Sequence, residues 1–367
     1  MSNDARQRLV VWAPVALGVV ALAAFFSLAP ASVGVAVAAA LIAVGVVMFA
    51  GWRRLAQVVV VLLLVTFFVS VLIRLLPGDP TNAIIPFSSP EQRAELRQEL
   101  GLNRNIFVQY GDFLGDFVTG DTKYYQSAGR QVAGTPVWDR LGNALPVSLL
   151  LMVYAQIIAL VIAIPLGIIT AYRAGSRFDK TVNTGAFALI ALPNFVIAYL
   201  LIYYLAVERD FFPTQGYVPY GENAREHFES LFLPALSLSA GLIAAYMRLL
   251  RSDMIQTLQE DFITMARSKG LTTRRILLRH ALRPSSFTLL TVAAINLGAL
   301  IGGVVIIEVI FQLPGLGLLL FQAINAKQYP AVQTFIGIIA IVYVLANVVV
   351  DVLYSVLDPR IRHARAA

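Results

Sequence analysis

The residues with the most distinctive chemistry lie in one short stretch, residues 260–271, which reads Glu-Asp-Phe-Ile-Thr-Met-Ala-Arg-Ser-Lys-Gly-Leu. Two carboxylates open this stretch, a small residue follows, and two basic residues precede a glycine. The stretch belongs to a polar loop, residues 248–284, that separates two long apolar runs. A charged loop held between two such runs is a surface for contact with another molecule.

Residue combinations that would support catalysis are missing from the sequence. There is no Gly-x-x-x-x-Gly-Lys-Ser/Thr motif, so the chain is not expected to hydrolyse ATP itself. There is also no His-Glu-x-x-His and no Gly-x-Ser-x-Gly. The three histidines, His227, His280 and His363, fall in separate loops, and the absence of cysteine excludes disulfides and thiolate metal sites. An intramembrane enzyme is therefore the weakest function class.

Composition predicts a polytopic membrane protein. The 367 residues are 58% hydrophobic and 13% charged, with a mean hydropathy of +0.75, far more apolar than a soluble domain. Seven charge-free runs are long enough to consider as membrane crossings, each of which needs about 20 apolar residues. They span 9–52, 55–73, 141–172, 181–207, 230–247, 284–307 and 328–350. The first is long enough for two crossings with a turn near Pro30, so eight helices are expected.

The distribution of basic residues predicts the orientation of these helices, because cytoplasmic loops carry the excess of lysine and arginine. Eighteen of the 28 basic residues fall in alternate loops, at 1–9, 51–54, 172–180, 248–284 and 358–367. These loops and both termini are predicted to be cytoplasmic, and 77–140, 208–229 and 311–331 external. Topology thus explains the net charge of +7 without nucleic acid. A cleaved signal peptide is the rival interpretation of the N-terminus, but the apolar run continues past the cleavage site that this would require.

The external segment 77–140 contains signals for two helices. Ser89, Pro90 and Gln92 form a capping box with proline at the first helical position, and Gly101 is placed to end that helix. A second, amphipathic helix is indicated by aromatic residues three to four positions apart. They are Phe107, Tyr110, Phe113 and Phe117. Packing on the membrane face or on the helix bundle is favoured for this stripe, over docking of an external protein.

In the loop 248–284 the pattern predicts two helices joined at a glycine. The first runs through about 254–269 and ends at Gly270, which accepts a left-handed conformation. The second begins at Thr272 or Thr273 and ends at about residue 282, before Pro284 opens the next span. Ile263, Met265 and Ala266 are expected to form the apolar edge of the first helix. A DNA-reading helix-turn-helix is a poor interpretation because the bilayer holds both ends, and a structural loop without a partner stays open.

This loop resembles the coupling loop, or "EAA" loop, of permease subunits in type I ABC importers. More narrowly, residues 55–363 resemble the B-type membrane subunit of the dipeptide/oligopeptide/nickel permease family. The matching segments outside the loop are Leu-Pro-Gly-Asp-Pro at 76–80, Val-Gln-Tyr at 108–110, Ile-Pro-Leu-Gly at 164–167, Glu-Val-Ile-Phe at 308–311, Pro-Gly-Leu-Gly at 314–317 and Asp-Pro-Arg-Ile at 358–361. Two regions depart from the family pattern, the N-terminal hairpin at 9–50 and the stretch 122–135.

The resemblance implies an all-α permease fold of about six helices, to which residues 1–54 add a transmembrane hairpin. Residues 55–76 would be the first family helix, 77–140 an external region, 141–357 the transmembrane core with a cytoplasmic coupling loop at 253–284, and 358–367 a cytoplasmic tail. It also implies that the coupling loop contacts an ATPase. The residues expected there are Glu260, Asp261, Ala266, Arg267, Lys269, Gly270 and Leu271.

Polar groups within the predicted spans are the other candidates for function, because such groups usually face a bundle interior or a cavity. Glu308 and Asp351 are the ionisable ones, and for both a structural role is favoured over contact with solute. Asn296, Gly298 and Gly302 share the span of Glu308 and indicate either close helix packing or the lining of a translocation path.

The expected function is that of an inner-membrane subunit in an ATP-driven importer of di- or oligopeptides. The implied partners are a C-type permease, two ATPase subunits that bind ATP and magnesium, and an external solute-binding protein, with no cofactor or metal in this chain. A nickel chelate, a sugar oligomer or another small solute is the alternative cargo. An ATP-independent channel or transporter is the second alternative.

Overall fold

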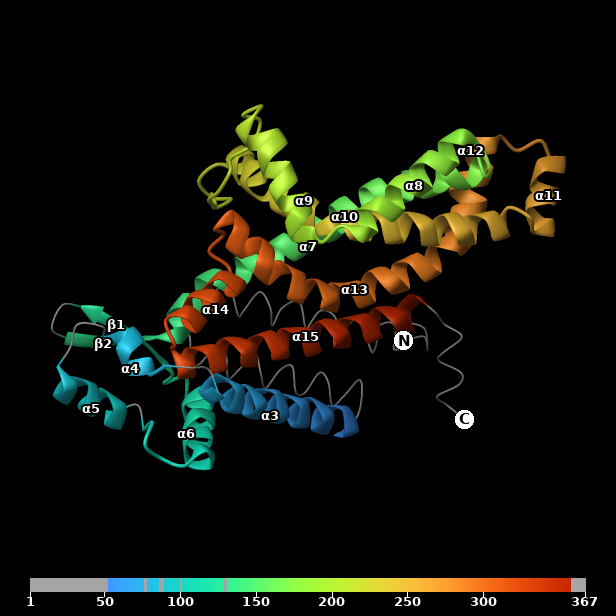
Figure 1. Cartoon of the computed structure of the whole chain (residues 1–367). Helices are drawn as coiled ribbons and strands as arrows, with labels where there is room; N and C mark the ends of the chain where they lie inside the picture. Colours follow the sequence, from blue (N-terminus) through green and yellow to red (C-terminus); the bar gives the residue numbers. More distant parts are fainter. Residues whose placement is uncertain (1–51, 76–77, 86–88, 100, 129–130, 358–367) are drawn as a thin grey trace. The chain divides into compact units, whose positions relative to one another are not determined.

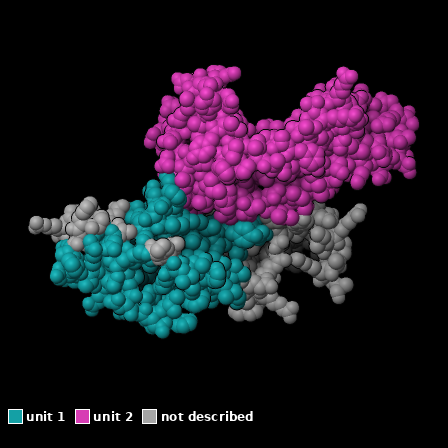
Figure 2. All heavy atoms as spheres, in the orientation of Figure 1, with its two compact units in different colours: residues 1–146, 318–352 teal, residues 147–317, 353–367 magenta. Residues whose placement is uncertain are grey.

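The structure is a computed structural model that describes residues 52–357, except 76–77, 86–88, 100 and 129–130. The predicted hairpin at 9–50 and the tail at 358–367 lie outside the described residues. The described chain is mostly helical (Figure 1). It divides into two compact units, coloured separately in Figure 2. One unit combines Met1–Pro146 with Leu318–Val352, and the other combines Val147–Gly317 with Leu353–Ala367.

Four helices of the described chain are long and apolar enough to cross a membrane: Val137–Tyr172, Ala224–Thr257, Thr273–Phe311 and Tyr329–Asn347. A fifth candidate is a pair of helices, Arg177–Ala191 and Asn194–Val207, that meet at an angle of 106°. The run 181–207, expected to be a single helix, is thus two helices separated by a break. Leu192 and Pro193 both have extended backbones at the bend, because proline lacks an N–H and disfavours the helical conformation of the residue before it.

The first unit joins helices from both ends of the described chain to a small two-stranded sheet. Its elements are α3 (Trp52–Leu75), α4 (Pro80–Ile84), α5 (Pro90–Glu99), α6 (Ile106–Thr119), β1 (Lys123–Ala128), β2 (Gln131–Pro136), the start of α7 (Val137–Tyr172), most of α14 (Leu316–Asn325) and α15 (Tyr329–Leu357) as far as Val352.

Both predicted helices of the segment 77–140 are confirmed. Ser89 N–H donates to Gln92 Oε1 at 3.1 Å and Gln92 N–H donates to Ser89 Oγ at 3.3 Å, which is the capping box at the start of α5. In α6 the aromatic stripe packs on α3, where the Tyr110 hydroxyl donates to the Leu63 carbonyl at 2.9 Å and Phe67 contacts the ring of Tyr110. The aromatic stripe therefore packs within the protein, as predicted.

A β-hairpin in the same segment corrects the all-α expectation. Strands β1 and β2 pair antiparallel, from Lys123 opposite Pro136 to Ala128 opposite Gln131. The buried side chain of Gln328 binds the edge of β1, since its Oε1 accepts from Tyr125 N–H at 3.0 Å and its Nε2 donates to the Tyr125 carbonyl at 2.7 Å. A side-chain amide thus satisfies backbone groups that an edge strand leaves unpaired.

The second unit is built around α10 (Ala224–Thr257). This helix packs against α8 (Arg177–Ala191), α9 (Asn194–Leu201) and α13 (Leu282–Phe311). The remaining part of α7 belongs to the same core, and η1 (Ile202–Val207) is a π-helical turn that continues α9.

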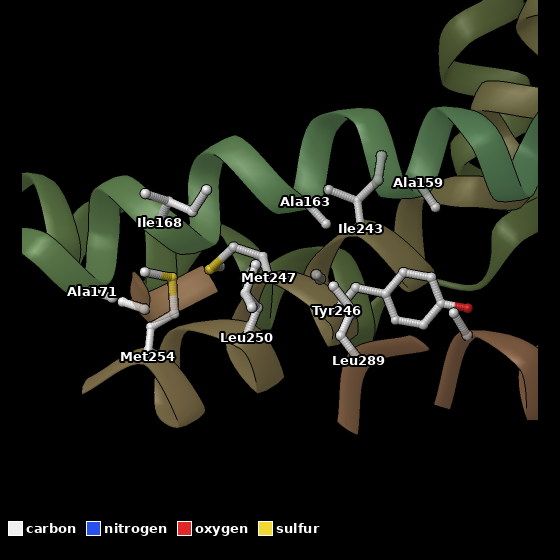
Figure 3. Packing of buried hydrophobic residues seen from close by; sticks show 14 of the residues in the cluster. Ala159, Ala163, Ile168, Ala171, Ile243, Tyr246, Met247, Leu250, Met254 and Leu289 are labelled. Carbon is white, nitrogen blue, oxygen red and sulfur yellow. The ribbon is translucent and has the colours of Figure 1, made fainter. Parts of the chain in front are cut away.

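Large side chains of α10 meet small side chains of α7 in this core (Figure 3). Tyr246, Met247 and Leu250 are buried, as are Ala159 and Ala163. At Gly167 a Cβ atom would lie 3.1 Å from Leu250, so the absence of a side chain there lets the two helices approach closely. Small residues at helix contacts serve the same purpose in membrane proteins generally.

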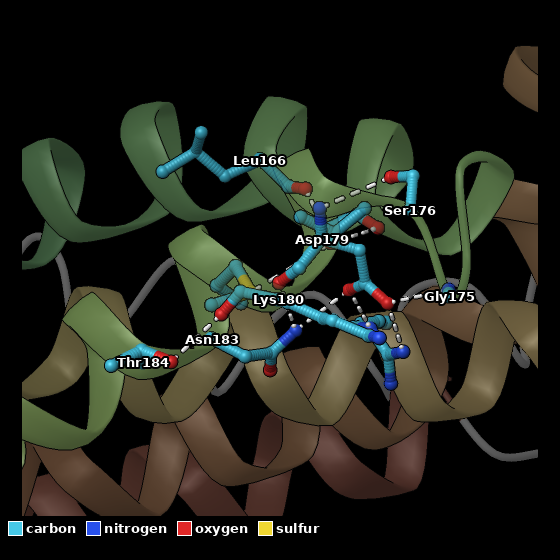
Figure 4. Close-up of polar contacts among 11 residues, drawn as sticks. Leu166, Gly175, Ser176, Asp179, Lys180, Asn183 and Thr184 are labelled. Carbon is cyan, nitrogen blue, oxygen red and sulfur yellow. Dashed lines mark hydrogen bonds and ion pairs between the residues drawn. The ribbon is translucent and has the colours of Figure 1, made fainter.

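One ion pair, not anticipated from the sequence, ties the start of α8 to α10 (Figure 4). The buried carboxylate of Asp179 accepts from Arg251 Nε at 2.6 Å and from Arg251 Nη2 at 2.7 Å. It also accepts from Gly175 N–H at 2.9 Å and from Asn183 Nδ2 at 2.7 Å. A two-point guanidinium–carboxylate contact with further donors fixes the geometry of both groups.

We expect Arg251→Ala to lower the thermal unfolding midpoint of the purified protein strongly, because it leaves the Asp179 charge buried without its partner, a loss of about 3–5 kcal/mol. The matched control is Arg225→Ala, which breaks the exposed pair Arg225–Glu229 and should cost at most about 1 kcal/mol. Differential scanning fluorimetry in detergent compares the two. Equal midpoints for both variants would contradict the conclusion that the buried Asp179–Arg251 pair stabilises the fold.

Candidate functional site

The polar loop begins with a break that separates α10 from α11 (Asp261–Ser268). A continuous helix through 254–269 was expected, and this is wrong, because α10 ends at Thr257 and Glu260 has an extended backbone. Met254 and Ile263 are both fully buried in one cluster. In an unbroken helix they would be about two and a half turns apart and would point in opposite directions. The break therefore lets both side chains reach the same core.

Helix α11 is attached to the protein by one side only. Ile263 is 0% exposed and Ala266 is 7% exposed, and both belong to the core cluster. Met265, expected on the same edge, is instead 58% exposed, and Phe262 is 44% exposed. The helix thus has a buried side that holds it in place and an apolar pair, Phe262 and Met265, on its surface.

The charged residues in and next to α11 lie on the exposed side. Glu260, Asp261, Arg267 and Lys269 are all exposed. The two carboxylates are at the N-terminal end of α11 and the two basic residues at its C-terminal end, which is the arrangement that the helix dipole favours. Ala266 differs from the others, because it packs inside this chain and does not face outward.

Gly270 ends α11 in the conformation expected of it. Its φ is +74°, its N–H donates to the Arg267 carbonyl at 2.9 Å, and the Leu271 N–H donates to the Ala266 carbonyl at 3.3 Å. These two bonds form a Schellman motif. No atom of the described residues lies within 4 Å of the place where a Cβ would be, so the backbone conformation, rather than lack of space, requires glycine here.

The second helix of the loop does not end before the next span. Short helix α12 (Thr273–Arg275) leads through η2 (Ile276–Ala281) into α13, and the whole stretch Thr273–Phe311 is one candidate span. The expectation that Pro284 would open a new helix is therefore wrong. Proline removes one backbone bond and crowds the preceding turn. A π-turn lies just before it, where Leu282 N–H donates to the Leu277 carbonyl, and this wider turn accommodates the ring.

The two ends of the loop are joined to each other. The hydroxyl oxygens of Thr257, the last residue of α10, and Ser285, near the start of α13, are 2.9 Å apart and hydrogen-bonded. Ile276 and Ala281 add buried apolar contacts from η2 to the core that holds Ile263. The loop is therefore a rigid continuation of α10 and α13.

Glu308, one of the intramembrane candidates, is fully buried and bonded to backbone and side-chain donors. Its Oε1 accepts from Ser148 Oγ at 2.5 Å and its Oε2 accepts from Gly317 N–H at 2.7 Å, while Ser148 Oγ accepts from Leu316 N–H at 2.9 Å. A Cβ on Gly315 would overlap the Glu308 carboxyl group. This carboxylate holds the loop that joins α13 to α14.

The other candidates on α13 have different environments. Asn296 is half-buried and interacts with the Tyr246 hydroxyl, and Gly298 is buried. Gly302 is exposed, and within the described part of the chain no atom lies within 4 Å of its Cβ position. Its neighbour Gly303, which the sequence analysis did not single out, is the one in close contact, 2.9 Å from Leu238. The side chain of Asp351 lies outside the described residues.

Comparison with known proteins gives two family matches that together cover most of the chain. Residues 163–363 match the family described as binding-protein-dependent transport system inner membrane component, and residues 47–152 match its N-terminal membrane component.

Three relatives represent the curated proteins that are similar to this chain. The probable peptide ABC transporter permease protein y4tP of Sinorhizobium fredii is 35% identical over 313 residues. The oligopeptide transport system permease protein AppB of Bacillus subtilis is 35% identical over 314 residues, and the dipeptide transport system permease protein DppB of Escherichia coli is 31% identical over 338 residues. Each alignment covers 85% of this chain and 98% of the relative.

These matches confirm the resemblance carried by residues 260–271 and by the motifs around them. The chain belongs to the family of binding-protein-dependent transport system inner membrane components, as a multi-pass inner-membrane permease subunit of an ABC importer.

Proposed function

We propose that this permease forms, with a second permease of the C type, the translocation path of an ATP-driven importer for di- or oligopeptides. The observation that carries the proposal is α11, a helix buried on one side through Ile263 and exposed on the other through Phe262 and Met265. The substrate class rests on relatives whose names specify peptides, dipeptides or oligopeptides. A nickel chelate, a sugar oligomer or another small solute is the alternative cargo, and an ATP-independent channel is the second alternative.

The topology that accompanies this function has eight spans and both termini in the cytoplasm. Residues 1–54 would form a hairpin added to a family core of about six helices, and α3 would be the first family helix. The distribution of basic residues supports this orientation, which places α11 on the cytoplasmic side and the segment 77–140 outside.

In the proposed mechanism, α11 binds in a cleft of an ATPase subunit. Phe262 and Met265 supply apolar contact, and Glu260, Asp261, Arg267 and Lys269 supply charged contact around it. Ala266, Gly270 and Leu271 contribute indirectly, because they fix the helix and its C-terminal turn. Closure of the ATPases on ATP and magnesium would move α11, and its rigid junctions would carry the movement into α10 and α13.

The remaining partner is an external solute-binding protein that delivers the peptide. We expect ATPase activity of the assembly in liposomes to rise when a peptide-loaded binding protein is added. We also expect Glu260→Ala to abolish most of that rise without loss of membrane insertion, because the carboxylate would be lost from the ATPase contact. If only a non-peptide solute stimulates the ATPase, the cargo is that solute and not a peptide. The absence of any ATPase partner would favour the alternative of an ATP-independent channel.

The two sides of α11 should respond differently to truncation. Phe262→Ala and Met265→Ala remove exposed side chains, so we expect the folded permease to keep its thermal midpoint and to lose about 1 kcal/mol or more of binding to the ATPase. Ile263→Ala creates a cavity in the core and should cost about 2–5 kcal/mol of stability. Midpoint and ATPase co-purification are measured together. Retained ATPase binding in the Phe262 and Met265 variants would refute the proposed contact.

The effect of a substitution at Gly270 on coupling should depend on backbone strain and not on side-chain size alone. An alanine at φ +74° costs about 1–2 kcal/mol, and valine costs more, whereas asparagine tolerates this conformation better. We therefore expect peptide-stimulated ATPase activity to fall in the order glycine, asparagine, alanine, valine, with insertion unchanged. Normal stimulation in Gly270→Val would show that the turn is not needed for coupling.

A further inference from the structure

A pocket of about 90 Å³ lies in the first unit, among the ends of α3 and α15 and one side of α6. Charged side chains in its wall come from all three places: Arg74, Asp112, Asp116 and Lys327. In the proposed topology these residues face the external side, where a solute arrives. Nothing in the coupling mechanism uses this pocket.

The cationic part of the pocket is held in place by the fold. Arg74 is partly buried in the last turn of α3, with Nη1 donating to the Ser70 carbonyl and Nη2 donating to Gln109 Oε1. Lys327 has a positive φ of +51°, and its Nζ occupies the space where a side chain on Gly78 would be. Two cationic groups from distant parts of the sequence thus line the same small pocket.

The acidic part of the pocket is more exposed. Asp112 and Asp116 are one helical turn apart on α6, and Asp112 pairs with the exposed Arg104 at 3.0 Å. Burial, together with the nearby carboxylates of Asp121 and Asp112, raises the pKa of Asp116. A carboxylate surrounded in this way is stabilised in its charged form by an added cation.

Two uncharged polar side chains of the pocket, Gln109 and Gln328, are already hydrogen-bonded within the protein. Gln109 Nε2 donates to the carbonyls of Arg104 and Leu102 at 2.7 and 3.3 Å. Gln328 is occupied by the edge of β1. The charged side chains of the pocket are the candidates for recognition: Arg74 and Lys327 are partly buried, and Asp112 and Asp116 are exposed.

The size of the pocket limits what it holds. Sites for whole small molecules are typically about 300–1,000 Å³, so this pocket takes an end group and not a complete peptide. A carboxylate is the end group that matches a small pocket lined by an arginine and a lysine.

We propose that this pocket is an external subsite of the permease for the C-terminal carboxylate of a short peptide. The proposal rests on the proposed function, because it takes the cargo to be a peptide. It adds recognition of the cargo by the permease itself, between release from the binding protein and passage through the membrane.

The test uses the complete importer in nanodiscs without binding protein, with the dipeptide alanylalanine as probe and saturation-transfer NMR as the measurement. We expect the wild type to bind alanylalanine and to bind its C-terminal amide about tenfold more weakly, since a hydrogen bond to a charged group is lost. Arg74→Gln and Lys327→Gln should weaken binding of the free carboxylate by a similar factor. Arg225→Gln, at an exposed external arginine, is the matched control and should bind like wild type.

Equal binding of the dipeptide and its amide by the wild type, or no binding at all, would overturn the subsite. If Arg74→Gln disturbs the contact between α3 and α6, the Lys327→Gln variant decides the outcome. Unchanged dipeptide binding in Lys327→Gln would also overturn the subsite. Import of the dipeptide into proteoliposomes is measured in parallel with binding protein present. No import by the wild type would refute the proposed function, whereas import with normal binding by both pocket variants would refute the subsite alone.

Discussion

Burial of Ile263 and Ala266 in the core of the second unit is the constraint on which the proposed coupling depends. An isolated helix of eight residues is not stable in water, so α11 exists where it does because its inner side packs against the protein. The same packing leaves Phe262 and Met265 on the surface. A single set of contacts thus explains both why the helix is rigid and which residues it presents to a partner.

Features that depend on neighbours in the sequence were predictable. The capping box at Ser89, the aromatic stripe of α6 and the left-handed turn at Gly270 each follow from rules that act within a few residues. The loop 248–284 was also recognisable, because its polarity contrasts with the runs on either side. Residue type and short spacing carried enough information for each of these.

Features that depend on distant residues were missed. The pair Asp179–Arg251 joins positions 72 residues apart, and the contact between Gln328 and β1 joins positions 203 residues apart. The break before α11 has the same origin, because it is favoured by a core assembled from several helices and not by any local stop signal. Met265 was also grouped wrongly with Ile263 on one apolar edge, although residues two positions apart in a helix lie about 200° from each other.

The two ends of α13 are built for different tasks. At one end Glu308 is buried and bonded to Ser148 and to the backbone of Gly317, which fixes the loop that follows. A buried carboxylate needs this full set of partners, so displacement of that loop would be costly. At the other end a π-turn lies beside Pro284, and such irregular turns are where helices bend most readily. Movement of α11 would therefore reach the start of α13 through its junction, with any bend concentrated at the π-turn, while the end at Glu308 keeps its position.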